Sequence, residues 1–289
     1  MFRSFIELQE LCDEKQLPVW QVIQLDDAQD QDISAEASWE KMCHLWDVMK
    51  ASVEGYTPNM RSRSGLVGGE GGKMDAYLEN HEPLSGSFSG KVISRALKMG
   101  CANACMHRIV AAPTAGACGV LPAVLYSCWK DKGAAEEEIV KALYIAAGVG
   151  QIIAQRAFLA GAAGGCQAEI GSASGMAAAA LTALYGGTLT QMGHACSMAL
   201  KNLMGLVCDP VAGLVEVPCV KRNVGGAVNA LAAADMALAG IESAIPADQV
   251  IDAMREVGEA MDPSLRETSR GGLAVTPKAL EYTAKIKES

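Results

Sequence analysis

The segment IVKALYIAAGVGQIIAQRAFLAGAA at residues 139–163 indicates the fold class most directly. Its small and aliphatic residues follow one another without the alternating β-branched pattern that is typical of strands. MAAAALTAL at residues 176–184 has the same character. Because small side chains let helix backbones approach closely, both segments are typical of helices buried in a core.

A membrane span is the alternative interpretation of these apolar segments. A span needs about 20 consecutive apolar residues, and residues 176–184 are too few. We therefore expect buried helices and no membrane. Polar side chains interrupt the longer segment at Lys141, Gln151, Gln155 and Arg156.

The same composition continues outward, since the residues around these segments are rich in Ala, Gly, Leu, Met and Cys. Residues 1–55 carry apolar side chains at helical spacing, so we expect an N-terminal helical extension packed on the main body. No break in composition divides the chain. We predict a mainly α fold, a closely packed helical domain with long Gly-rich loops, as one catalytic domain over residues 1–289.

Proline and glycine mark the segments between the helices. Pro246 is expected to open a helix that Asp262 closes, and Pro277 to begin the last helix. Between residues 52 and 89 the composition shifts to Gly, Ser, Pro and charged residues, with SRSGLVGGEGGK at 62–73. We predict a long loop over 52–89, of the kind that often carries function.

Composition and charge favour an intracellular enzyme for small molecules. The chain has 289 residues and a net charge of −9, and its Lys and Arg are scattered among acids, which disfavours nucleic-acid binding. Its N-terminus has no uninterrupted apolar stretch, so we expect a cytoplasmic protein without a signal peptide. Ten cysteines in a reducing compartment favour core packing, redox thiols or metal ligation over disulfides.

Three of the cysteines have helix-breaking neighbours. Cys166 follows a pair of glycines, Cys208 precedes a proline by two positions, and Cys219 directly follows a proline. Such neighbours leave backbone amides free and permit the close approach that a bulky cluster needs. Thiolates suit iron-sulfur clusters or zinc, and three thiolates leave one iron of a cluster open as a Lewis acid. The chain has no Cys-x-x-Cys pair, so spacing by itself leaves core packing as the alternative.

Three longer segments carry a resemblance to a known family. AAPTAGACGVLPAVL at 111–125, GCQAEIGSASGMAA at 165–178 and NLMGLVCDPVAGLVEVPCVKRN at 202–223 closely resemble the alpha chain, or alpha domain, of bacterial iron-sulfur L-serine dehydratases. The resemblance runs from about residue 62 to about residue 277.

The resemblance implies that Cys166, Cys208 and Cys219 ligate a 4Fe-4S cluster. It also implies an L-serine ammonia-lyase, which converts L-serine to pyruvate and ammonia with the cluster acting as a Lewis acid on the substrate hydroxyl. Single-chain members carry a beta portion with a Ser-His-Thr-x-Gly-Pro segment, which is absent from these 289 residues. We therefore expect a separate beta chain as partner, and the general base, which this sequence does not identify, is expected from that chain.

The turn AAPTAGACG at 111–119 is a candidate substrate-binding segment. A turn that opens a helix offers free amides and, at Thr114, a hydroxyl to a carboxylate. The resemblance favours substrate contact for Thr114, together with Ala115 and Gly116. An ordinary turn is the alternative.

Two further segments complete the candidate site. GLVGGEGGKM at 65–74 fits neither a Walker loop nor a dinucleotide fingerprint. We expect a lid or an anion-binding loop with Lys73 as counter-charge, and a solvated loop is the alternative. Asn223 precedes a glycine pair and is expected to orient substrate or to bond to a cluster sulfur, with helix capping as the alternative.

Other functions fit parts of the sequence. A relative that acts on L-cysteine and releases sulfide would use the same open iron. A pyridoxal phosphate enzyme performs the same elimination through a Schiff-base lysine, for which Lys91 is the candidate, but a Gly-rich phosphate loop after it is missing. A redox-sensing helical assembly would rest on the ten cysteines. Cys101 and Cys105, one helical turn apart, are expected to pack in the core.

Overall fold

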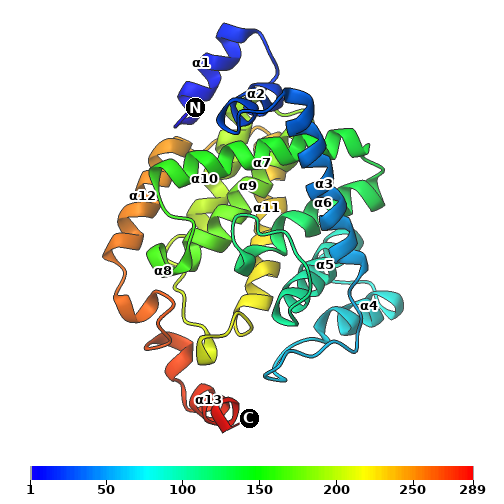
Figure 1. Ribbon diagram of the computed structural model, residues 1–289, viewed down its shortest axis with the longest axis vertical. Helices are drawn as coiled ribbons and strands as arrows, with labels where there is room; N and C mark the ends of the chain where they lie inside the picture. Colours follow the sequence, from blue (N-terminus) through cyan, green and yellow to red (C-terminus); the bar gives the residue numbers. More distant parts are fainter. Residues whose placement is uncertain (1, 289) are drawn as a thin grey trace.

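Four helices rich in alanine and glycine form the centre of the structure. In the computed structural model, which describes residues 2–288, α9 (Ser172–Leu184) packs against α7 (Glu136–Arg156), α10 (Leu189–Leu203) and α11 (Cys219–Leu238) (Figure 1). Eleven of the thirteen residues of α9 are buried. The short side chains of these helices allow dense packing without voids. The predicted mainly α fold is confirmed.

The other helices surround this centre. Helix α5 (Ser87–Ala104) packs on α11, α6 (Val120–Lys132) on α9, and α12 (Ala247–Ala260) on α10. Between residues 2 and 288 the only β structure is one isolated parallel bridge. The remaining α-helices of that range are α1 (Phe5–Lys15), α2 (Val19–Asp30), α3 (Ala35–Glu54), α4 (Glu70–Asn80), α8 (Gly161–Gly164) and α13 (Pro277–Glu288).

Local capping sets several helix boundaries. Ser4 caps α1, and Thr188 forms a reciprocal capping box with Gln191 at the start of α10. Pro246 immediately precedes α12, and Pro277 is the first residue of α13. The predicted helix starts at these two prolines are confirmed.

The N-terminal helices are fastened to α7. A Cβ on Gly148 of α7 would lie 2.5 Å from Cδ1 of Ile23, so the glycine allows α2 to approach. The Ser38 hydroxyl in α3 lies 2.7 Å from the hydroxyl of Tyr144, and Trp39 stacks on the same tyrosine ring at 6.1 Å. Both apolar packing and polar contacts therefore join residues of the first 55 to the central helices.

The predicted continuous loop over residues 52–89 is wrong, because helix α4 occupies residues 70–80 within it. Gly71 lies in the first turn of α4, and a Cβ there would lie 2.5 Å from Cγ of Lys98. The glycine therefore serves a close helix contact and not flexibility. A run of glycines in a sequence does not distinguish these two uses.

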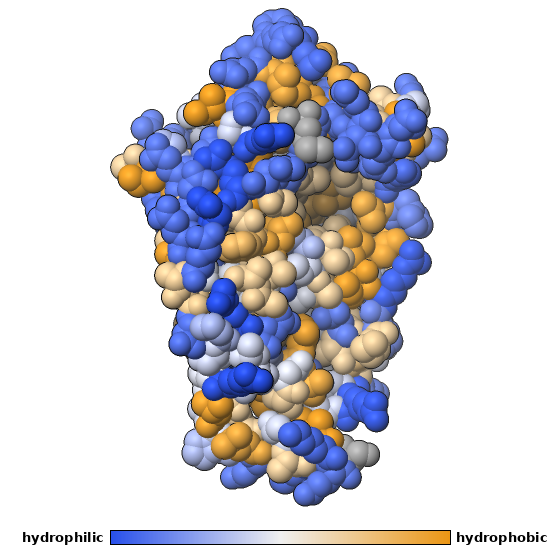
Figure 2. Space-filling view, turned by 60° about the vertical axis from the view of Figure 1, so that its left-hand side comes forward, coloured by the Kyte–Doolittle hydropathy of each residue, from blue (hydrophilic) through white to orange (hydrophobic). Residues whose placement is uncertain are grey.

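The surface is mixed in character. Among residues 2–288, no helix has both the length and the apolar composition that crossing a membrane requires. At the end of the molecule formed by α13, hydrophobic atoms are exposed (Figure 2). Leu273, Val275 and Leu280 are 43%, 45% and 53% exposed, respectively.

Gly100 in α5 and Gly225 in α11 give a matched test of close helix packing. A Cβ on Gly100 would lie 3.1 Å from Cα of Val220, whereas a Cβ on Gly225 meets nothing within 4 Å. Gly100→Ala should give a free energy of unfolding about 1–3 kcal/mol lower than Gly225→Ala, because both gain helix propensity but only the first overpacks the core. Urea unfolding followed by circular dichroism measures this difference. Equal free energies would contradict the close approach of α5 and α11.

Candidate active site

Cys166 lies where the chain leaves α8 and turns toward α9. It follows Gly165 (φ 77°) and precedes a π-helical turn, η2 (Gln167–Gly171), which continues into α9. A Cβ on Gly165 would lie 2.8 Å from the carbonyl oxygen of Leu206, so both its backbone angle and its surroundings favour glycine. This turn places the buried Cys166 against the segment that leads to Cys208.

Cys208 is positioned by the C-terminal part of the chain. Its amide donates to the carbonyl of Leu265 (2.8 Å), and its carbonyl accepts from the amide of Glu267 (2.7 Å). These two bonds form the isolated bridge of the fold. Cys219 is the first residue of α11 and follows Pro218. Three separate segments therefore carry the predicted cysteine ligands.

Cys166, Cys208 and Glu169 bring their possible ligand atoms together, all within 4.8 Å of one another. A Cβ on Gly161 would lie 2.9 Å from both the Cys208 sulfur and Oε2 of Glu169. Glu169 was not predicted from the sequence. It lies three positions after Cys166 on a helical turn, and this spacing, which places two side chains on one face, was the available signal.

The charges of Cys166 and Glu169 act on the thiol of Cys219. Burial is the main cause that raises the pKa of the Cys219 thiol to about 12, and negative charge on Cys166 and Glu169 adds to it. The structure thus brings the third predicted ligand into the same neighbourhood, although its sulfur is not in the group of three within 4.8 Å.

Arg222 is the cation that contacts the candidate site, and it bonds to a cysteine sulfur, a backbone carbonyl and a carboxylate. Nη1 donates to the Cys166 sulfur (3.2 Å) and to the carbonyl of Val207 (2.7 Å), and Nη2 donates to Asp209 (2.8 Å). The hydrogen bond from Cys208 is the main cause that lowers the pKa of Cys166, and the Arg222 charge lowers it further. Cys166 is therefore the first thiol of this pair to ionise.

Glu169 is partly buried. Burial is the main cause that raises the pKa of its carboxyl above the usual value, and the charge of Glu267 acts in the same direction. The hydroxyl of Thr114 lies near enough to lower that pKa in part. Thr114 Oγ1 is nevertheless buried without a hydrogen bond of normal geometry among the described residues. A buried hydroxyl of this kind is a candidate for contact with a ligand.

The turn that contains Thr114 is clamped by Asn223. Asn223 Nδ2 donates to the carbonyls of Gly116 (2.8 Å) and Cys219 (3.0 Å), and Oδ1 accepts from the amide of Gly119 (2.8 Å). Both N–H donors of this amide group are therefore used within the protein. The amides of Ala115 and Gly116 donate to no acceptor within residues 2–288. The predicted role of Asn223 in direct substrate contact stays a prediction, whereas its contact with the turn is observed.

Lys73 lies in the first turn of α4 with an exposed side chain. It is not part of the group formed by the cysteines and Glu169. Its proposed role as a counter-charge stays a prediction. Lys91, considered above for a Schiff base, lies in α5, is 45% exposed and pairs with Asp131 at 2.8 Å.

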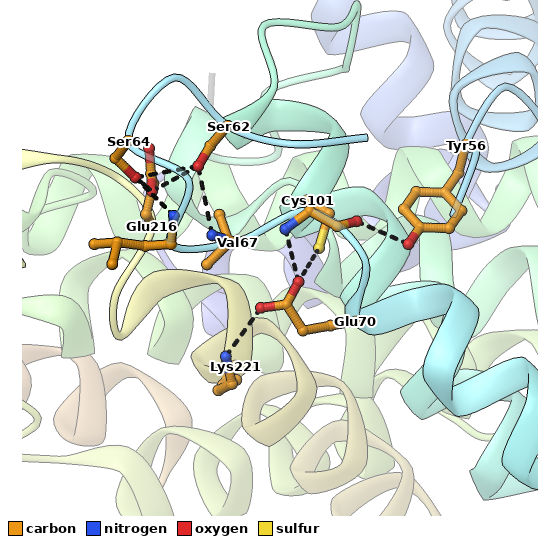
Figure 3. A network of polar contacts seen from close by, with 10 residues as sticks. Tyr56, Ser62, Ser64, Val67, Glu70, Cys101, Glu216 and Lys221 are labelled. Atoms are coloured by element: carbon orange, nitrogen blue, oxygen red, sulfur yellow. Dashed lines mark hydrogen bonds and ion pairs between the residues drawn. The ribbon is translucent and has the colours of Figure 1, made fainter. Parts of the chain in front are cut away.

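The Gly-rich segment 62–70 is fixed beside Cys219 by two acidic side chains (Figure 3). Glu216 accepts hydrogen bonds from the hydroxyls of Ser62 (2.9 Å) and Ser64. Glu70 accepts from the thiol of Cys101 (3.3 Å) and pairs with Lys221 at 3.2 Å. Because Glu216 precedes Cys219 and Lys221 follows it, both contacts join this segment to the start of α11.

The other cysteines lie in environments that suppress thiolate formation. Burial raises the pKa of Cys101, Cys118 and Cys196 to about 12. All ten cysteines lie in the described part of the chain, and none is in a disulfide. Inert core thiols therefore account for these positions better than reactive sites.

Histidines do not supply an evident base. His44, His81 and His107 are exposed. The fourth histidine, His194 in α10, accepts a hydrogen bond at Nδ1 from the amide of Ser243 (3.2 Å). This contact gives His194 a structural role.

Sequence comparison assigns the chain to a protein family. The serine dehydratase alpha chain family matches residues 14–274. The chain belongs to that family.

Relatives within the serine dehydratase alpha chain family include proteins of similar length. The chain is 46% identical over 286 residues to a probable L-serine dehydratase alpha chain of Bacillus subtilis (strain 168), covering 99% of this chain and 95% of the relative. It is 39% identical over 275 residues to the L-serine dehydratase alpha chain of Peptoniphilus asaccharolyticus, with coverage of 95% and 94%. An L-serine dehydratase of Escherichia coli (strain K12) is 45% identical over 175 residues, which are 60% of this chain but 38% of that longer relative.

Asn223→Ala tests the clamp on the Thr114 turn. The substitution removes the partners of the Gly119 amide and of the Gly116 and Cys219 carbonyls, so we expect the free energy of unfolding to fall by about 1–3 kcal/mol. Asn202→Ala is the control, since it removes an exposed contact with Asn229. Urea unfolding compares the two variants, and a loss no larger for Asn223→Ala than for the control would be evidence against the clamp.

Proposed function

We propose that the chain is the alpha chain of an L-serine dehydratase, which converts L-serine to pyruvate and ammonia. The observation that carries the proposal is the convergence of Cys166 and Cys208, with Cys219 nearby, in a chain of the serine dehydratase alpha chain family. Relatives that span nearly the whole chain carry the name L-serine dehydratase, alpha chain. We further propose that it acts in the cytoplasm.

Cys166, Cys208 and Cys219 would hold a 4Fe-4S cluster. Three soft thiol ligands suit iron-sulfur chemistry. The close approach of the Gly161 backbone to the Cys208 sulfur, which a Cβ would prevent, also fits a site that must admit a bulky group. When bound, the cluster would supply a Lewis acid for the substrate hydroxyl.

The Thr114 turn would bind the substrate carboxylate. The free amides of Ala115 and Gly116 and the unpaired hydroxyl of Thr114 are three donors on one short segment. Anions bind well to groups of free backbone amides and hydroxyls on one turn. Asn223 supports this role because it fixes the turn through Gly116 and Gly119, so the donors are oriented before substrate arrives.

Arg222 would keep the ligand segments in register. It connects the Cys166 sulfur with Asp209, the residue that follows Cys208. Asp209 in turn accepts a hydrogen bond from the amide of Leu273 (2.8 Å). The cation thus joins α11, both cysteine segments and the C-terminal segment.

A separate beta chain would complete the site and supply the general base. The described histidines are exposed or used structurally. Exposed apolar side chains also lie near the cysteine segment, because α13 packs on the turn at 211–213 that lies between Cys208 and Cys219. A partner that covers this end would exclude water from the site.

The first functional prediction concerns the ligands. Cys166→Ala, Cys208→Ala and Cys219→Ala should each abolish the cluster in anaerobically prepared protein, because three thiolates are few for a cluster that usually has four. Cys101→Ala and Cys105→Ala, which are part of α5 and its C-terminal cap, should keep it. Iron and acid-labile sulfide analysis makes the comparison. Full iron content in any of the first three variants would overturn the ligand assignment.

The second functional prediction concerns the partner. The reconstituted alpha chain should form little pyruvate from L-serine, and addition of a matching beta chain should raise the rate about 100-fold or more, the usual contribution of a positioned general base. L-Cysteine in parallel is the control for a desulfidase. Full turnover by the alpha chain alone would contradict the two-chain proposal, and sulfide release that outpaces pyruvate formation would replace the serine assignment.

A further inference from the structure

Glu169 is an acidic side chain without a cation at the centre of the candidate site. It forms no ion pair with a residue in the described range 2–288. Arg222, the cation that contacts Cys166, is already bonded to Cys166, Asp209 and a backbone carbonyl. A partly buried carboxylate without a counter-charge is costly, unless a ligand supplies positive charge.

The surroundings of Glu169 are suited to a cation. Its neighbours include the thiols of Cys166 and Cys208, and the carboxylate of Glu267 acts on it at longer range. All of these groups are neutral or negative. Because opposite charge lowers the energy of such a group, a small cation is the ligand that this region favours.

Two glycines lie next to the Glu169 carboxylate, at positions where a larger side chain would block a ligand. A Cβ on Gly116 would lie 3.4 Å from Oε2 of Glu169, and a Cβ on Gly161 would lie 2.9 Å from it. Gly116 belongs to the turn with the free amides, and Gly161 begins α8. The carboxylate of Glu169 therefore lies between the donors of the Thr114 turn and the cysteine sulfurs.

We propose that Glu169 binds the α-ammonium group of L-serine, an inference that rests on the proposed function. The three polar groups of serine then have three chemically matched partners. The carboxylate takes the donors at Thr114, Ala115 and Gly116, the ammonium takes Glu169, and the hydroxyl faces the cysteine ligands. Three different contacts around one tetrahedral carbon distinguish the L from the D enantiomer.

The test uses the cluster-loaded complex of alpha and beta chains with Glu169→Gln. The amide keeps the size of the side chain but not its charge, so KM for L-serine should rise about 10- to 100-fold, as expected for loss of a charge-assisted contact. Binding of 3-hydroxypropanoate, which is serine without the ammonium group, should be unchanged. Steady-state pyruvate formation gives KM for L-serine, and competition against L-serine gives the inhibition constant of 3-hydroxypropanoate. Iron content should equal that of the unmodified complex.

Glu267→Gln is the matched control, because this exposed side chain is a charged neighbour of the site that does not belong to the close group. Its effect on serine binding should stay below about threefold, as for a solvent-screened charge. Loss of iron from Glu169→Gln, a fall in kcat with unchanged KM, or equal weakening of both compounds would each overturn the assignment. If the unmodified complex forms no pyruvate, the proposed function itself fails, whereas normal turnover with any of those three results refutes the role of Glu169 alone.

Discussion

The first two turns of α11 hold the candidate site together. Cys219, Arg222 and Asn223 are spaced at positions i, i+3 and i+4, so their side chains lie on one face of the helix. Through this face Arg222 reaches Cys166 and Asn223 reaches the Thr114 turn. Each bond also satisfies a group that would be costly to leave unpaired in the interior. A shift of α11 would therefore disturb the proposed metal ligands and the proposed substrate turn together.

The position of α11 depends in turn on residues without side chains. Gly100 lets the start of α11 approach α5, and a Cβ on Gly226 would lie 3.0 Å from both Ile170 and Val120. Ile170 lies in η2, next to Glu169, and Val120 begins α6 after the Thr114 turn. The small residues that predict a helical core therefore also shape the candidate site. They let the backbones of α11, η2 and the segment after the Thr114 turn pack closely together.

Composition allowed the helical class to be predicted, and the family resemblance of the long motifs implied that Cys166, Cys208 and Cys219 share one site. The structure confirms the helices and brings Cys166 and Cys208 together. Helix α4 could not be predicted, because its glycines resemble a loop in the sequence. Gly71 instead allows close contact with Lys98 of α5, which only the structure shows. Glu169 was missed for a related reason, since an acidic residue acquires its significance only when a cysteine 39 positions further along, Cys208, lies beside it.

The lengths of the relatives bear on the proposed completion of the site by a beta chain. The matched part fills 95% of the Bacillus subtilis relative but 38% of the Escherichia coli relative. When two parts share one polypeptide, the covalent link raises their effective concentration, and a weak interface is sufficient. When the parts are separate chains, the interface itself must supply the association free energy, which favours apolar surface near the site. The exposed Leu273, Val275 and Leu280 lie at the end of the molecule where Asp209 bonds to the Leu273 amide. Association of the proposed beta chain at that end would therefore act on the segment next to Cys208, so that docking and alignment of the proposed ligands would be coupled.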